Sequence, residues 1–321
     1  MIDLSEVGGA GEHVLRHGEH EAVIVEAGGG LRTYQVAGVD IVAGYPAGTL
    51  CPSARGHWLV PWPNRIRDGR YRFGGHEHQL PIFGDEGRHA IHGLIRWMPF
   101  QVVARDASSV ELAMVQPARP GYPWPLRVRT RWSLDDGGLS AWLHVENLSD
   151  DEAPFGAGAH PYLSAGHGTA DGATVGGGTA GGGTIDDMTV TVPGATVVRG
   201  EDGIMTTRAA VGDDSDFRRA RRIGPNRLGL YSDLERDASG LARVVAERPD
   251  GWTVSLWQDE AWPFVLLYTA DAVSEEEGVR RSLAVEPMTS AVDVFNTGDG
   301  LIVLKPGGVF EGTWGITADA R

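Results

Sequence analysis

Cysteine is almost absent from this sequence: Cys51 is the only one in 321 residues. A single thiol excludes a disulfide within the chain and a zinc site built from four cysteines. Basic residues are also scarce, because 28 lysines and arginines face 43 acidic residues, which gives a formal net charge of −15. Nucleic acids and anionic membranes both attract basic surfaces, so we expect neither as a partner.

Long apolar runs are missing as well. The longest, residues 262–268, is far shorter than the roughly 20 residues that cross a bilayer. Residues 1–11 contain Asp3 and Glu6 and lack the apolar centre of a signal peptide. The sequence therefore predicts a soluble cytoplasmic protein.

The helical period of 3.6 residues is the third absence, and short strand-like segments take its place. Residues 127–134 alternate arginines with Val, Thr and Trp, and this period of two predicts a half-buried strand. A turn at residues 135–138 and a second alternating segment at 139–146 complete a predicted hairpin. Similar segments occur at residues 22–26, 189–192, 253–257, 265–268 and 301–304.

These segments, with 46 glycines and 18 prolines, predict an all-β protein: a large antiparallel β-sandwich with few short helices. Residues 217–222 predict at most one basic turn of helix. Residues 165–184 are rich in Gly, Ala and Thr, but no Lys-Ser/Thr follows their glycine run, so they predict a surface loop and not a phosphate cradle. No linker divides the chain, and we predict one domain over residues 1–321.

Three side chains are candidates for acid–base chemistry. His92 lies in the apolar segment 90–94, and His160 lies among the small residues of 156–162. For each, a hydrogen-bonded structural histidine is the alternative interpretation. Glu286 lies in the apolar segment 283–288, where desolvation would raise the pKa of its carboxyl group toward the range of a general base. Its alternative is a buried ion pair with an arginine such as Arg65.

Other residue types add weaker signals. Indole rings stack well on the C–H faces of sugars, and three of the ten tryptophans, Trp62, Trp97 and Trp257, are candidates for the wall of a sugar site. Core packing is the alternative for each of them. His76 and His78 flank a glutamate, but no helix aligns them as a metal clamp, so we predict no metal site.

Five ordered motifs give these residues a common context. The chain resembles the aldose 1-epimerase (galactose mutarotase) family in segments that follow the family's order. They are residues 61–71 (PWPNRIRDGRY), 91–94 (IHGL), 159–163 (AHPYL), 216–218 (DFR) and 285–289 (VEPMT), the last continued by 301–306 and 314–316. Each motif is short, but together they span nearly the whole chain.

The resemblance implies a β supersandwich with an open sugar cleft and no cofactor. It implies that His160 is the acid that protonates the ring oxygen, and that Glu286 is the base that takes the proton of the anomeric hydroxyl. His92 and Arg65 would position the sugar by hydrogen bonds. The expected partner is a small-molecule sugar, and the expected assembly is a monomer or a homodimer.

Two positions depart from the family pattern. Leu228 stands where relatives place an acid that binds sugar hydroxyls, and Asp233 is a candidate to replace it. Asp293 stands where close relatives often have Asn, and the sequence does not explain it. Two alternatives remain open beside a mutarotase of free aldohexoses. One is a hexose-6-phosphate mutarotase that uses the arginines at 218, 219, 221 and 222; the other is a catalytically silent sugar-binding or regulatory protein.

Overall fold

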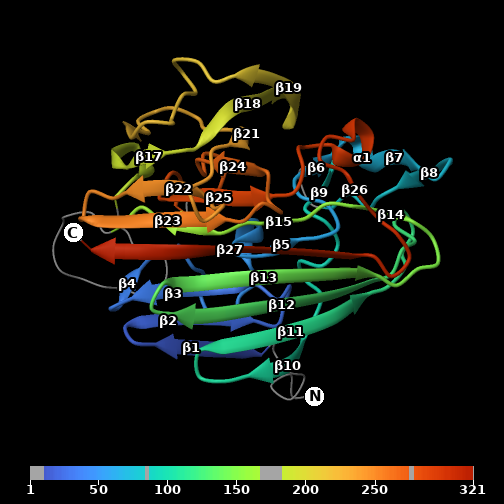
Figure 1. Ribbon diagram of the computed structural model, residues 1–321, viewed down its shortest axis with the longest axis horizontal. Coiled ribbons are helices and arrows are strands. Elements are labelled where there is room, and N and C mark those ends of the chain that lie inside the picture. Colours follow the sequence, from blue (N-terminus) through green and yellow to red (C-terminus); the bar gives the residue numbers. More distant parts are fainter. Residues whose placement is uncertain (1–10, 84–86, 167–182, 275–277, 321) are drawn as a thin grey trace.

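The computed structural model describes residues 11–83, 87–166, 183–274 and 278–320. All strand pairs within these ranges are antiparallel, and two large sheets dominate the fold (Figure 1). The larger sheet has nine strands, in the order β10 (Gln101–Arg105), β11 (Ser109–Gln116), β12 (Leu126–Asp135), β13 (Gly138–Asn147), β27 (Val309–Ala320), β23 (Trp252–Gln258), β22 (Ala242–Glu247), β17 (Thr189–Thr191) and β20 (Arg221–Arg222).

The second sheet has eight strands and carries the candidate site. Seven follow one another in the order β19 (Ile204–Ala210), β18 (Gly194–Glu201), β21 (Leu230–Leu234), β24 (Phe264–Tyr268), β25 (Ser282–Met288), β15 (Gly158–Ala159) and β5 (Trp58–Leu59). The eighth, β16 (Tyr162–Ser164), also pairs with β25.

Smaller sheets complete the molecule. A four-stranded sheet, blue in Figure 1, lies beside β11 and β12. Its strands are β1 (Glu12–His17), β2 (His20–Val25), β3 (Leu31–Val36) and β4 (Val39–Asp40). The two-stranded pairs are β6 (Arg65–Ile66) with β9 (Ala90–Ile91), β7 (Arg70–Phe73) with β8 (His76–Gln79), and β14 (Ala153–Phe155) with β26 (Ile302–Leu304).

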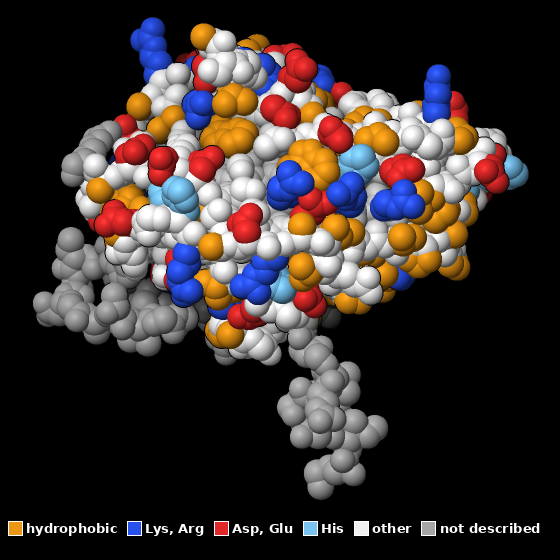
Figure 2. Space-filling view, turned by 60° about the horizontal axis from the view of Figure 1, so that its bottom comes forward, with side chains coloured by type: hydrophobic (Ala, Val, Ile, Leu, Met, Phe, Trp, Pro, Cys, Tyr) orange, Lys and Arg blue, Asp and Glu red, His pale blue; other side chains and the backbone are white. Residues whose placement is uncertain are grey.

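Helix is a minor component of the described residues. The single α-helix is α1 (Val294–Thr297), and the 3-10 turns are Pro52–Ala54, Arg67–Gly69 and Ile185–Asp187. None of these helices is long and apolar enough to span a membrane. On the face shown in Figure 2, acidic and basic side chains are intermixed rather than gathered by sign.

The predicted hairpin is confirmed: β12 and β13 pair from Leu126 and Asn147 to Asp135 and Gly138. The five other predicted segments overlap β2, β17, β23, β24 and β26. The predicted helical turn at residues 217–222 is wrong, because Arg221–Arg222 extends the sheet beside β17 and the carbonyl of Phe217 accepts a backbone hydrogen bond from Val192. Most of the predicted loop at 165–184 lies outside the described residues.

One hydrophobic core fills the space between the two large sheets. Because successive side chains of a strand point to opposite faces, Val254 and Leu256 of β23 meet Leu283 and Val285 of β25 in this core. Burying one such side chain contributes about 1.5–3 kcal/mol to stability. The same alternation turns Glu286 to the other face of β25, away from the core, and so decides where the candidate site lies.

Candidate active site

Strand register brings His160 and Glu286 together. On β25, Met288 pairs with Gly158 and Ala284 pairs with Tyr162, so His160 lies opposite Glu286. The Nε2 atom of His160 is 3.3 Å from the Oε1 atom of Glu286. The two residues are only 4% and 1% exposed. Two titratable side chains, 126 positions apart in the sequence, thus form one buried pair.

Burial controls the protonation of this pair. It raises the pKa of Glu286 well above its ordinary value of 4.5, and the nearby Arg65 guanidinium opposes part of that rise. Burial, together with the positive charge of Arg96, lowers the pKa of His160 to about 3. The Oε2 atom of Glu286 has no hydrogen-bond partner among the described residues. Buried polar atoms are normally satisfied, so an unsatisfied carboxylate oxygen marks a place for a ligand group.

His92 is built to donate a hydrogen bond into the same site. Its Nδ1 atom accepts the backbone N–H of Asn64 at 3.2 Å, which assigns the ring hydrogen to Nε2. Its ring meets the ring of His160 edge-on, with centroids 5.1 Å apart. His92 has a positive φ of 58°, and at Gly93 a Cβ atom would lie 2.1 Å from the carbonyl oxygen of Val60. The glycine in the histidine motif therefore permits the tight turn that presents His92.

Arg65 is held in place by Asp293. The backbone N–H of Asp293 donates to the carbonyl oxygen of Arg65 at 2.8 Å, and its Oδ1 atom accepts the backbone N–H of Arg67 at 2.9 Å. Asp293 is 2% exposed and therefore clamps β6 from within the protein. The guanidinium of Arg65 lies against Gly203, where a Cβ atom would be 3.0 Å from it. The departure at position 293 thus has a structural role next to the site.

Sequence reasoning missed a group of aromatic and basic residues behind His160. The ring of Tyr162 stacks on His160 with centroids 4.9 Å apart, and the Arg55 guanidinium lies 4.6 Å from the Tyr162 ring centroid. Arg96 is only 9% exposed, and His57 is 1% exposed. Arg96 follows the first histidine motif within an apolar stretch, and that signal, which drew attention to Glu286, would have found it.

Trp257 lies apart from this site. Its neighbours in β23, Val254 and Leu256, point into the core, so Trp257 lies on the outer face of the nine-stranded sheet. Its ring covers Gly315, where a Cβ atom would be 2.4 Å away. Glu286 lies on the outer face of the other sheet. The whole core therefore separates the two residues.

The other tryptophan candidates also have different roles. Trp62 is 1% exposed and packs edge-on against Phe295, which is core packing. Trp97 is 48% exposed, and its ring lies 4.4 Å from the Arg96 guanidinium. Among the described residues, neither tryptophan ring contacts His160 or Glu286.

Asp233 lies one residue before the end of β21, in the eight-stranded sheet. Its side chain is 62% exposed, and its carboxylate is 3.9 Å from Arg208, whose guanidinium also binds Asp299. Leu228 is packed against the main core. No contact among the described residues joins either of them to His160, Glu286 or Arg65. Asp233 as a sugar ligand remains a prediction.

Comparison with known proteins agrees with the fold and with the motifs. A model of the family described as aldose 1-epimerase matches residues 12–317. The uncharacterized protein YihR of Escherichia coli is 30% identical over 297 residues, which cover 91% of this chain and 88% of YihR.

Solved structures resemble the fold along the whole chain. A GalM/aldose epimerase homologue from C. elegans has a TM-score of 0.80 at 16% identity, covering 97% of this chain and 99% of its own. Galactose 1-epimerase from Lactobacillus acidophilus has a TM-score of 0.76 at 17% identity, with 96% and 94% covered. The antiparallel sheets are those of a galactose mutarotase-like fold. With the family match over nearly all residues, these findings show that the chain belongs to the aldose 1-epimerase family.

Proposed function

We propose that this protein is a cofactor-independent aldose 1-epimerase that interconverts the α and β anomers of an aldohexose. His160 is the general acid and Glu286 is the general base. The observation that carries the proposal is the buried contact of 3.3 Å between them, beside a Glu286 oxygen that has no hydrogen-bond partner within the described part of the chain. Arg65 and His92 supply positive charge and a hydrogen-bond donor for the sugar.

The reaction needs two coordinated proton transfers. Opening the ring requires a proton on the ring oxygen O5 and removal of the proton from the hydroxyl on C1. The open-chain aldehyde then rotates about the C1–C2 bond and closes on its other face. The two residues exchange roles during closure, so the protein returns to its starting protonation state.

Together, His160 and Glu286 hold the one transferable proton that this reaction needs. Burial favours neutral His160 beside protonated Glu286. Moving one proton from Glu286 to His160 produces the carboxylate base and the imidazolium acid without a change in total charge. Arg65 favours this active form because its charge stabilises the Glu286 carboxylate. Hydrogen bonds from sugar hydroxyls to the carboxylate would favour it further.

The two alternatives find less support. A hexose-6-phosphate mutarotase was expected to use the arginines near residue 220, but Arg218 binds Asp216, Arg221 binds the carbonyl of Asp213, and Arg222 binds Asp187. Three of the four guanidinium groups of this cluster thus already have a partner. A silent binding protein is favoured only by Leu228, and it would not need an acid and a base at contact distance.

Polarimetry tests the proposal. The wild-type protein should accelerate the equilibration of freshly dissolved α-glucose or α-galactose, and His160→Asn should lower kcat by about 10²–10⁴. His144→Asn is the matched control, because His144 also binds a glutamate, Glu311, at 2.8 Å, but on a solvent-exposed pair. We expect the control to retain activity. Wild-type protein that accelerates none of a panel of aldoses would rule the proposal out.

A further inference from the structure

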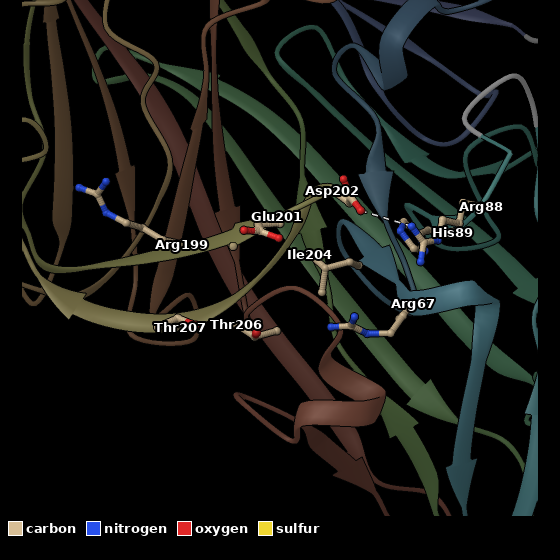
Figure 3. Close-up of a pocket in the computed structure, with 10 residues that line it drawn as sticks. Arg67, Arg88, His89, Arg199, Glu201, Asp202, Ile204, Thr206 and Thr207 are labelled. Carbon is tan, nitrogen blue, oxygen red and sulfur yellow. Dashed lines mark hydrogen bonds and ion pairs between the residues drawn. The ribbon is translucent and has the colours of Figure 1, made fainter.

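The proposed acid, His160, has an open side and a buried side. On the open side, a cavity of about 550 Å³ lies beside Arg65, between the β18–β19 turn and the segments that contain Arg67 and Arg88 (Figure 3). This cavity adjoins the residues proposed to bind the sugar and belongs to the substrate side of the site. The buried side is formed by β5 and the residues just before it. It holds His57, a histidine to which the proposed reaction assigns no role.

Strand register places His57 beside His160. Ala159 pairs with Trp58, so the next pair along the ladder is His160 with His57. The backbone N–H of His160 donates to the carbonyl oxygen of His57 at 3.0 Å, in agreement with this pairing. Side chains of directly paired residues lie on the same face of a sheet, with Cβ atoms about 4.5–5.5 Å apart. His57, His160 and Glu286 thus form one row of titratable side chains on one face of the sheet.

A glycine bulge introduces His57 into this row. The backbone N–H of Gly56 donates to the carbonyl oxygen of His160 at 2.9 Å, so Gly56 and His57 together oppose the single residue His160. Gly56 has a φ of 74°, and a Cβ atom there would collide with the carbonyl oxygen of Leu31. Bulges that begin with a left-handed glycine are common next to active sites, where they redirect a side chain.

The His57 ring is enclosed, and its nitrogens lack partners. His57 is 1% exposed, and neither Nδ1 nor Nε2 has a hydrogen-bond partner in the described part of the chain. The Cδ2 edge of the ring rests on the β2–β3 turn, where an added Cβ atom would be 2.8 Å away at Gly30 and 3.3 Å away at Gly28. The Nδ1 edge therefore faces away from this turn. Because buried polar atoms are normally hydrogen-bonded, we look for the partner of this edge in the adjacent site.

His160 needs an acceptor for its Nδ1 hydrogen in both states of the proposed reaction. In the resting state, the protonated Glu286 carboxyl group donates to Nε2 of His160, so the ring hydrogen of the neutral imidazole lies on Nδ1. In the active state, the imidazolium carries hydrogens on both nitrogens. No other residue within the described ranges is hydrogen-bonded to this Nδ1 atom. A buried N–H group without an acceptor would destabilise both states.

We propose that His57 is a positioning residue that accepts the Nδ1 hydrogen of His160, directly or through one bridging water. This role rests on the proposed function, in which His160 is the acid. Burial, together with the positive charge of Arg96, lowers the pKa of His57 to about 3, so its ring is neutral at pH 7 and keeps an acceptor nitrogen. An uncharged acceptor fixes the tautomer and the ring plane of His160 without stabilising its imidazolium as a carboxylate would. His160 therefore remains a strong acid toward the ring oxygen.

Nitrogen-15 NMR of the histidine rings tests this contact without relying on catalysis. His160→Asn assigns the His160 signals. We expect Nδ1 of His160 to carry hydrogen in the wild-type protein at pH 7, and the resonance of that hydrogen to move upfield in His57→Leu as its acceptor is lost. A neutral His160 ring with its hydrogen on Nε2 in the wild-type protein would overturn the proposal, and so would an Nδ1–H resonance that His57→Leu leaves unchanged.

Polarimetry with α-glucose or α-galactose measures the consequence for the reaction. His57→Leu should lower kcat by about 10–100-fold, the effect of one hydrogen bond to a charged group, and should leave KM unchanged because His57 is too buried to touch a sugar. His57→Asn, whose Oδ1 atom takes the place of Nδ1, should restore most of kcat. His78→Leu is the matched control and should keep wild-type activity. The His78 ring packs on Tyr71 and Trp124, with centroids 4.9 and 5.1 Å apart, and its Nε2 also lacks a partner among the described residues.

The outcomes separate this role from the proposed function. If the wild-type protein accelerates a sugar and His57→Leu does so equally well, the positioning role is overturned and the epimerase proposal stands. Equal losses of kcat in His57→Leu and His57→Asn would mean that the packing of the ring matters and not its acceptor, which would also overturn the role. A wild-type protein that accelerates no sugar would overturn the proposed function, and the NMR signals of His160 would still decide whether His57 accepts its hydrogen.

Discussion

Glu111 on β11 and Glu286 on β25 are both buried carboxylates, 4% and 1% exposed, on the outer faces of the two large sheets. Glu111 receives hydrogen bonds on both oxygens, from Arg129 at 2.9 Å and from Arg131 at 3.2 Å. Among the described residues, Glu286 has His160 at 3.3 Å on one oxygen and no hydrogen-bond partner on the other. The two glutamates thus share burial and differ in how far the protein satisfies them.

The difference reverses the direction of the pKa shift. Burial alone raises the pKa of both carboxyl groups, but the hydrogen bonds from Arg131 and Arg129 outweigh it at Glu111 and hold its pKa below the ordinary value. At Glu286 the single charge of Arg65 does not outweigh the effect of burial. The pKa of this carboxyl group therefore stays well above its ordinary value. Burial by itself therefore does not mark a general base. An incomplete set of hydrogen-bond partners around a buried carboxylate is the feature that distinguishes Glu286.

Activity should show the largest difference between the two glutamates. Glu286→Gln removes the proposed base without changing the shape of the side chain, and we expect kcat to fall by about 10²–10⁴. Glu111→Gln should leave kcat near the wild-type value, because the whole core lies between Glu111 and the site. Polarimetry with α-glucose measures both. Equal losses in the two variants would mean that the effect is structural.

A moderate effect is expected at the clamp on Arg65. Asp293→Ala removes the acceptor for the Arg67 backbone N–H and loosens β6, so KM for the sugar should rise by about tenfold, and by more than kcat falls. Asp293→Asn keeps an acceptor at Oδ1 and should restore most of the affinity. A fall in kcat with KM unchanged would contradict a positioning role.

Stability should show the smallest effects, with opposite signs at the two glutamates. The raised pKa of Glu286 means that the folded protein loses stability as pH rises above about 4.5, so Glu286→Gln should be more stable at pH 8, on the order of 1 kcal/mol. The lowered pKa of Glu111 stabilises the fold above that pH and is lost on acidification. Glu111→Gln should therefore be less stable at pH 8, by about 1–2 kcal/mol.

Urea denaturation at pH 5 and pH 8 measures these changes in the free energy of unfolding. The advantage of Glu286→Gln should be larger at pH 8 than at pH 5, since the wild-type carboxyl group is penalised only where the unfolded chain would ionise. A destabilised Glu286→Gln variant at pH 8 would show that the carboxylate is held by partners, as Glu111 is.

Alternation in the sequence predicted strands well but could not say which outer face bears the site. Arg127 to Leu134 alternate clearly because one face of β12 is core and the other is solvent. The same pattern in β23 places Trp257 outward, and only the packing of the two sheets shows that this is the wrong side. Residues 217–222 failed for a related reason, because the edge pairing with β17 outweighs their local preference.

The residues of the candidate site could be predicted from the sequence, but their arrangement in space could not. The apolar surroundings of Glu286 and the small residues around His160 are visible in the sequence, and the family motifs connected them. Their contact depends on the register of β25 with β15 and β16, which the sequence does not state. The clamp by Asp293 and the cavity beside Arg65 depend on segments that are far from Arg65 in the sequence. No local sequence pattern indicates them.

The most direct test of the contrast is a carbon-13 NMR titration of the glutamate side-chain carboxyls, with Glu286→Gln and Glu111→Gln used to assign the two signals. We predict that the Glu286 carboxyl titrates well above pH 4.5 and the Glu111 carboxyl below it. A Glu286 signal that titrates at or below pH 4.5 would contradict the contrast and would show that partners hold the Glu286 carboxylate as they hold that of Glu111.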